Sequence, residues 1–245
     1  MPIYSDRDIA TNHNVDFVIS PFDSKRITPL GYDLSADHAL LITFGGQATI
    51  VTSKALEMPA WSMAVLIAKE YLWLSGRVVG ILHSRGSLSA RGLVLNSTTV
   101  DPQWSGRMIF CIHNASPFPV DLNLADPVIT LVINPINSEP RHPPATNPFR
   151  VIEDHYKDRL PAGVVDKFIS SASDLASPEY SKFSAATHKA SAKGWIGRKL
   201  SVIASNWKSY PIRMLTKVVV ALSAVFSLVL IIEKIILLYI EHIKP

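Results

Sequence analysis

Short apolar runs separated by turn-forming residues dominate the first 137 positions of the chain. The clearest runs cover residues 63–67, 78–82, 108–112 and 128–133, and they are rich in β-branched side chains. Runs of this length and composition are typical of buried β-strands. Before them, residues 1–25 predict a short helix followed by a strand at 15–20. Many short strands at this spacing predict a mainly β domain, a sandwich or distorted barrel, over residues 1–137.

A polar loop, residues 84–106, separates the second and third of these runs. Loops held by rigid strands often carry binding sites, although a solvated hairpin is the alternative interpretation. The planar guanidinium of Arg85 and the hydroxyl of Ser87 suit a phosphate, and Gly86 lets a ligand approach the backbone closely. The carboxylate of Asp101 suits a metal-bound water or a sugar hydroxyl, or else it caps its own Asp-Pro turn.

Two stretches of this loop, RGSLS at 85–89 and VDPQWSG at 100–106, resemble the central motifs of the dCTP deaminase and trimeric dUTPase superfamily. Three further stretches resemble family motifs in the same order, at 4–9, at 27–34, and at Asn114 with 118–122. The resemblance spans about residues 3–137. It implies a dUTPase-like, jelly-roll-like distorted β-barrel that forms a homotrimer. It also implies a pyrimidine deoxynucleotide ligand, such as dCTP or dUTP, together with Mg²⁺.

The resemblance also implies roles for individual residues. The implied substrate-binding residues are Arg85, Gly86, Ser87, Arg91, Thr98, Thr99 and Gln103. Asp101 and Cys111 occupy the catalytic positions: Asp101 matches the aspartate that orients water in dUTPases, whereas Cys111 stands where deaminases carry a glutamate. A thiol lacks the acid–base range of that carboxylate, so dUTP hydrolysis is favoured over dCTP deamination. The alternative is a catalytically lapsed module that senses nucleotide or only trimerises.

Two further departures from the family motifs concern the same loop. Gly86 replaces the first serine of the first motif, and Ala90 falls where the next motif arginine is expected. The loop is also about two residues shorter than in deaminases. No cysteine–histidine cluster has zinc spacing, so a zinc-dependent cytidine deaminase is disfavoured and no metal-ligating residue is predicted.

Residues 138–180 read as a proline-rich linker followed by helices. The pattern predicts helical structure over residues 149–175, divided by the Pro-Ala-Gly sequence at 161–163. By resemblance, Tyr156 and Lys157 are candidates to close over a nucleotide base. The alternative is a helix whose exposed side chains only meet solvent.

The remainder of the chain is basic and then apolar. Residues 181–211 predict a basic amphipathic juxtamembrane helix, or else a helix packed on its own domain. Residues 212–243 include 15 consecutive uncharged positions at 218–232 and predict one C-terminal transmembrane helix on an α-helical stalk. The distribution of lysine and arginine then predicts a single-pass membrane protein whose N-terminal domain is cytoplasmic.

Charge and cysteine content add two constraints. The net charge of +4 comes from the second part of the chain, where residues 142–245 hold 14 Lys/Arg against 8 Asp/Glu. This uneven placement argues against nucleic-acid binding by the whole protein. The single cysteine forms no disulfide within the chain, which is compatible with a reducing compartment.

Overall fold

The computed structural model describes residues 3–142, 144, 149–172 and 177–192. All of them belong to the first of two units of the chain, Met1–Gly194, the second being Trp195–Pro245. The chain begins with helix α1 (Asp6–Asn12) and strand β1 (Phe17–Ser20), as the sequence predicts. The Ser5 hydroxyl accepts a hydrogen bond from the Asp8 amide, and the Asp8 carboxylate accepts one from the Ser5 amide. This reciprocal capping box fixes where α1 starts.

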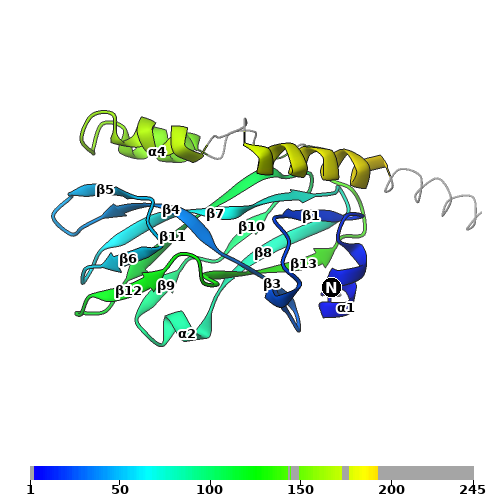
Figure 1. The fold of residues 1–245 in the computed structure, drawn as a ribbon, viewed down its shortest axis with the longest axis horizontal. Helices are drawn as coiled ribbons and strands as arrows, with labels where there is room; N and C mark the ends of the chain where they lie inside the picture. Colours follow the sequence, from blue (N-terminus) through cyan, green and yellow to red (C-terminus); the bar gives the residue numbers. More distant parts are fainter. Residues whose placement is uncertain (1–2, 143, 145–148, 173–176, 193–245) are drawn as a thin grey trace, which may run out of the picture. The chain divides into compact units, whose positions relative to one another are not determined.

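Twelve further strands and four short helical segments make up the rest of the named elements. After β1 come η1 (Ser24–Arg26), β2 (Ile27–Thr28), β3 (Gly31–Leu34), β4 (Ala36–Ile42), β5 (Ala48–Val51), β6 (Ala55–Met58), β7 (Met63–Leu74), β8 (Val78–Ser84), α2 (Gly86–Ser89), β9 (Leu93–Leu95), β10 (Thr98–Val100), β11 (Ser105–Asn114), β12 (Val120–Asn123), β13 (Ile129–Pro135), α3 (Arg150–Tyr156) and α4 (Val164–Ala172). The mainly β prediction is therefore confirmed (Figure 1).

The strands form separate sheets rather than the closed barrel expected from the resemblance. One sheet has the order β5-β4-β7-β11-β9, with β1 also paired to β7, and we call it the β7 sheet. A second sheet has the order β10-β8-β13-β3-β2, and β12 pairs with β6 in a third. Within the described residues no pairing joins these sheets into a cylinder, so the barrel prediction is wrong in that respect. All the pairings between the named strands are antiparallel.

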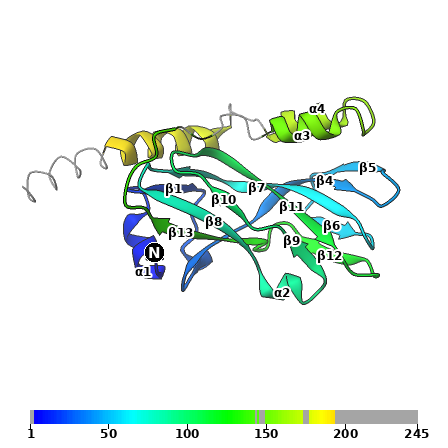
Figure 2. The same cartoon turned by 180° about the vertical axis from the view of Figure 1, so that it is seen from behind.

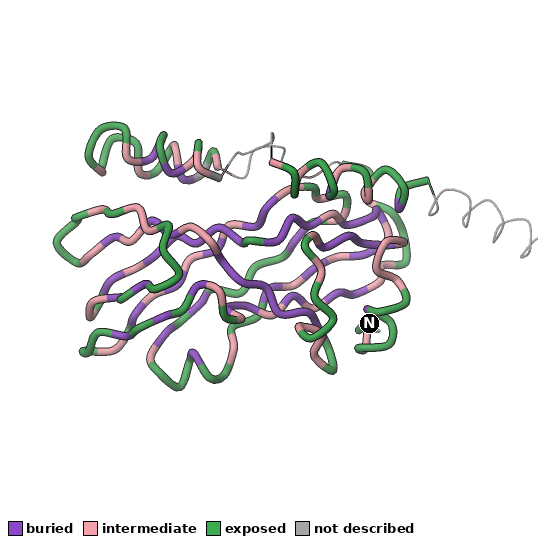
Figure 3. The backbone as a smooth tube through the Cα atoms, viewed as in Figure 1, coloured by how far each residue is buried: buried purple, intermediate pink, exposed green. Residues whose placement is uncertain are grey.

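The core lies against the inner face of the β7 sheet. Successive residues of a strand point to opposite faces, and β11 divides accordingly. Phe110 and Ile112 are buried in the main core cluster, which also takes side chains from β3, β8 and β13. Ile109 and Cys111 point the other way and belong to a second apolar cluster, which we call the outer cluster. The buried segments follow the strands in Figure 3.

Helices α3 and α4 cover the outer face of the β7 sheet (Figures 1 and 2). Their buried side chains, Ile152, Val165 and Phe168, pack with Leu40 and Val65 of the sheet. The break between the two helices falls at 161–163, as the sequence predicts. The apolar side of α3 is packed on the sheet, Tyr156 is partly buried in the outer cluster, and Lys157 is exposed.

A further helical segment, residues 178–192, packs on the β7 sheet beside β1. Its Phe183 is buried, and the Phe183 ring stacks on Tyr71 of β7 with centroids 5.3 Å apart. This segment includes the first part of the predicted juxtamembrane helix, 181–211. Within the described part, its apolar side therefore packs on its own domain, which was the alternative interpretation of that helix.

None of the helices in the described ranges combines the length and apolar character needed to cross a membrane. This finding contradicts the expected localisation as a single-pass membrane protein with a cytoplasmic N-terminal domain. The predicted transmembrane segment, 212–243, and positions 193–211 of the predicted juxtamembrane helix lie outside the described residues.

Candidate functional site

Arg85 lies at the junction between β8 and the one-turn helix α2. Its Nη1 forms an ion pair with Oδ2 of Asp33, a buried residue of β3. The other carboxylate oxygen of Asp33 accepts a hydrogen bond of 2.6 Å from the Thr130 hydroxyl. A carboxylate held in this way from the sheet fixes the direction of the guanidinium, which remains partly accessible to solvent. The arrangement leaves a positioned cation at the surface.

The turn that follows is open on its outer side. A Cβ built on Gly86 would meet no atom within 4 Å, so nothing in the chain crowds the backbone there. Ser87 is exposed, while Leu88 is buried and anchors the turn in the core. A hydroxyl and a guanidinium on a fixed, open turn are suited to an anion such as a phosphate.

The second group of predicted site residues follows β10. Thr98 and Thr99 are exposed on this strand, which pairs with β8. Asp101 is exposed just after the strand, and its carbonyl accepts a hydrogen bond from the Trp104 amide. Gln103 has a left-handed backbone with φ of 67°, a conformation that costs a residue with a side chain about 1–2 kcal/mol.

Arg91 lies apart from both groups. Its guanidinium donates a hydrogen bond to the carbonyl of Asp121, and the side chain is exposed. The structure therefore places Arg91 against β12, held by a backbone oxygen.

A single chain does not bring the predicted residues into one site. Val100 pairs with Gly80 near the start of β8, so Asp101 follows at that end. Arg85 follows Ser84, at the other end of β8. Six residues of extended chain separate these levels, which corresponds to roughly 20 Å. Cys111 belongs to the other sheet.

Cys111 lies under the helical cover, among apolar side chains. It belongs to the outer cluster together with Val65, Ile109 and Tyr156. Burial raises the pKa of its thiol, and burial together with the neighbouring Cys111 raises the pKa of the Tyr156 hydroxyl. The Tyr156 hydroxyl contacts the sulfur of Met63 at 3.6 Å. A thiol with a raised pKa in apolar surroundings is poorly suited to transferring protons near neutral pH.

Two features of the site were not predicted from the sequence. Asp33 lies in one of the stretches that resemble family motifs, but no role was predicted for it. A buried acid in an apolar strand nevertheless indicates a partner of opposite charge. The proximity of Cys111 to Tyr156 depends on which face α3 covers, and no local pattern encodes that choice.

The side chains that could act as metal ligands determine how a magnesium ion could be bound. No group of three or more His, Cys, Asp or Glu side chains within the described ranges could hold a metal ion. Mg²⁺ commonly binds through one or two carboxylates plus substrate phosphates and waters. The exposed carboxylate of Asp101 fits that mode, in which the nucleotide brings most of the ligands.

Comparison with known proteins links these residues to one family. Residues 3–134 match the family described as dCTP deaminase-like. The dCTP deaminase of Pyrococcus horikoshii is 26% identical over 132 residues, which cover 54% of this chain and 84% of that enzyme. The dCTP deaminase of Thermococcus kodakarensis is 27% identical over 135 residues, 55% of this chain and 83% of that enzyme.

Solved structures of related proteins align at lower identity. A 2'-deoxycytidine 5'-triphosphate deaminase from Agrobacterium tumefaciens aligns with a TM-score of 0.46 and 13% identity, covering 54% of this chain and 46% of that chain. A dUTPase from the Staphylococcus aureus phage phi11, which coordinates a structural Mg(II) ion, aligns with a TM-score of 0.38 and 16% identity over 54% of this chain and 97% of that one.

Proposed function

Because the chain belongs to the dCTP deaminase-like family, we propose that it binds a pyrimidine deoxynucleoside triphosphate, such as dCTP or dUTP. The observation that carries this proposal is the ion pair between Arg85 and buried Asp33. It holds a guanidinium on an open turn beside Ser87, where the triphosphate would bind. In this proposal residues 1–137 form the nucleotide-binding domain, and the helices after residue 138 are an addition to it.

We propose that the functional unit is a homotrimer with sites shared between subunits. The roughly 20 Å between the levels of Arg85 and Asp101 supports this, since a single chain does not bring them together. Arg85 and Ser87 of one subunit would grip the phosphates, with Gly86 leaving room for them. Asp101, Thr98 and Thr99 of another subunit would complete the site, and Gln103 and Arg91 would lie at its edges.

The chemistry that fits these residues is hydrolysis of dUTP rather than deamination of dCTP. Asp101 is an exposed carboxylate that would hold the nucleotide-bound Mg²⁺ or orient the attacking water. When bound, Mg²⁺ would neutralise phosphate charge. The water would add to phosphorus, releasing dUMP and pyrophosphate. Cys111 has no part in this reaction, because it lies among apolar side chains.

A second candidate is a catalytically lapsed module that senses nucleotide without turning it over. The observation that favours it is the replacement of the acid–base position by Cys111, which is packed under α3 and α4. In this candidate Arg85 still binds the nucleotide phosphates, and the protein binds nucleotide without forming a product.

Thermal melting and product analysis test both candidates. Purified protein is melted with dUTP, dCTP and UTP in the presence of Mg²⁺, and the mixtures are then analysed for dUMP, pyrophosphate and ammonia. Stabilisation with formation of dUMP supports the hydrolase, and stabilisation without product supports the sensor. If none of the nucleotides raises the melting temperature at millimolar concentration, both are wrong and only a trimerising scaffold is left.

A further inference from the structure

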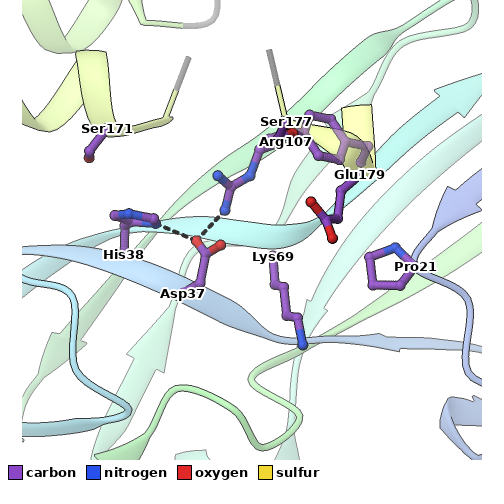
Figure 4. Close-up of a pocket in the computed structure, with 9 residues that line it drawn as sticks. Pro21, Asp37, His38, Lys69, Arg107, Ser171, Ser177 and Glu179 are labelled. Carbon is purple, nitrogen blue, oxygen red and sulfur yellow. Dashed lines mark hydrogen bonds and ion pairs between the residues drawn. The ribbon is translucent and has the colours of Figure 1, made fainter. Parts of the chain in front are cut away.

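A cavity of about 270 Å³ lies on the outer side of the β7 sheet, between the strands and the helical segments that follow the family domain (Figure 4). Its floor comes from β4, β7 and β11, which contribute Asp37, Lys69 and Arg107. Glu179 of the 178–192 segment and Ser177, just before that segment, form one wall. That wall lies outside the family match at residues 3–134, so the cavity is not part of the nucleotide site described above.

Two irregularities in strand pairing shape the floor. The register of β4 against β7 shifts between Ala36 and His38, and that of β11 against β7 shifts between Arg107 and Ile109. The first shift lies opposite Ile67 and Ala68 of β7, and the second lies opposite residues 67–71, which include Lys69. Bulges redirect side chains, and they are frequent beside binding sites. Here they bring Asp37 and Arg107 together over one part of β7.

Arg107 is nearly completely buried, with 7% of its surface exposed. Its Nε donates a hydrogen bond of 2.6 Å to the carbonyl of Ala68, and its Nη2 forms an ion pair with Oδ1 of Asp37. The guanidinium carbon lies 5.7 Å from the centre of the Tyr71 ring. The remaining Nη1 group donates to no residue in the described ranges. Nη1 is not one of the buried side-chain atoms that lack a partner in these ranges, so it is accessible to solvent and can donate to a ligand in the cavity.

Asp37 is also held in place. The same oxygen that meets Arg107 lies 2.6 Å from Nδ1 of His38, as the dashed lines in Figure 4 show. Burial alone would raise the pKa of Asp37, but the hydrogen bond from His38 and the charges of Arg107 and His38 hold it below its usual value. Asp37 is therefore an anion near neutral pH.

Charges of both signs remain available around the cavity. Neither Lys69 nor Glu179 has an ion-pair partner in the part of the chain that the structure describes. A simple anion would meet the carboxylates of Asp37 and Glu179, and a simple cation would meet Arg107 and Lys69. A molecule that carries one charge of each sign satisfies both sets. The volume lies just below the roughly 300–1,000 Å³ of typical ligand pockets, so the molecule must be small.

We propose that this cavity binds a small zwitterion of amino-acid size. The carboxylate of the ligand is bound by Nη1 of Arg107 and by Lys69, and its ammonium group is bound by Glu179. Because one wall belongs to the 178–192 segment and the floor to the β7 sheet, the ligand joins the family domain to the helices added after it.

The test uses the full 245-residue chain and a panel of the twenty α-amino acids with β-alanine and taurine, by thermal melting and calorimetry. At least one compound is expected to raise the melting temperature and to bind stoichiometrically. Its analogues lacking either the amino or the acidic group are expected to bind at least tenfold more weakly. The proposal is overturned if no compound binds at tens of millimolar, or if the analogues bind equally well.

Substitutions of cavity residues test whether the zwitterion binds in this cavity. Arg107 is too buried for a safe substitution, so Lys69→Met and Glu179→Gln, both on exposed side chains, carry the test. Each is expected to weaken the zwitterion at least tenfold. The matched controls Lys25→Met and Glu57→Gln change exposed charges that do not line the cavity and are expected to leave affinity unchanged. Equal affinity in all four variants would place the ligand elsewhere and refute the proposal.

Discussion

The turn at Arg85 and the strand position Cys111 are two parts of the predicted site, yet their surroundings are opposite in kind. Arg85 is partly accessible and is held by the charge of Asp33. Cys111 packs among apolar side chains, with Tyr156 and the α3–α4 helices over it. The predicted phosphate-binding turn is thus polar, whereas the predicted acid–base position is packing surface. The two predicted positions must therefore be tested separately, one for binding and the other for chemistry.

The largest expected effect comes from uncovering Cys111. Phe168 of α4 is fully buried in the outer cluster, and Phe168→Ala should cost about 3–5 kcal/mol of helix docking. Because Cys111 is the only cysteine, alkylation reports its exposure directly. We expect slow alkylation in the wild type and faster alkylation in the variant, measured by mass spectrometry. Lys167→Ala, on the exposed side of α4, is the control. Equal alkylation rates in all three proteins would show that α4 does not shield the thiol.

The next effect concerns the other half of the comparison. Arg85→Ala removes a charge-assisted contact worth roughly 1.5–3 kcal/mol, so nucleotide affinity should fall about tenfold to more than a hundredfold. Calorimetry with dUTP and Mg²⁺ measures this, with Arg150→Ala as a control, since Arg150 is exposed on α3. Cys111 alkylation should stay slow. Unchanged affinity in Arg85→Ala would remove this turn from the nucleotide site.

A smaller effect separates packing from catalysis at Cys111. Cys111→Val keeps an apolar side chain of similar volume and should change the free energy of unfolding by less than about 1.5 kcal/mol. Cys111→Glu places a carboxylate among apolar side chains and should be clearly less stable than the valine variant. Urea titration compares them. The wild type should release no ammonia from dCTP, and robust deamination would contradict the assignment of Cys111 to packing.

The smallest effect tests the backbone beside Asp101. Gln103→Gly relieves the left-handed conformation, whereas Gln103→Ala keeps it. The glycine variant should be more stable than the alanine variant by about 1 kcal/mol, as measured by urea unfolding. An alanine variant as stable as the glycine variant would mean that this conformation costs nothing here.

The sequence was sufficient for features that depend on local pattern. The apolar run at 108–112 predicts a strand, and it lies within β11. The Pro-Ala-Gly sequence at 161–163 lies between α3 and α4, as expected. Features that depend on residues far apart in the chain could not be predicted from the sequence. Asp33 meets Arg85 from another strand, and Cys111 meets Tyr156 from a helix that comes later in the chain. A closed barrel and separate sheets use the same strands and differ only in which edges pair, so the sequence pattern could not distinguish them.

Strand β7 has a consequence for the speed of folding. It pairs with β1, β4 and β11, and these strand pairings place Phe17 opposite Leu74 and Met63 opposite His113. Every such pair closes a long loop of chain, whose entropy is lost before the hydrogen bonds form. Domains dominated by distant pairings fold in milliseconds to seconds, whereas helical bundles fold in microseconds to milliseconds. Until β11 arrives, the long edge of β7 is open to another unfolded chain, and refolding at high protein concentration should therefore compete with aggregation.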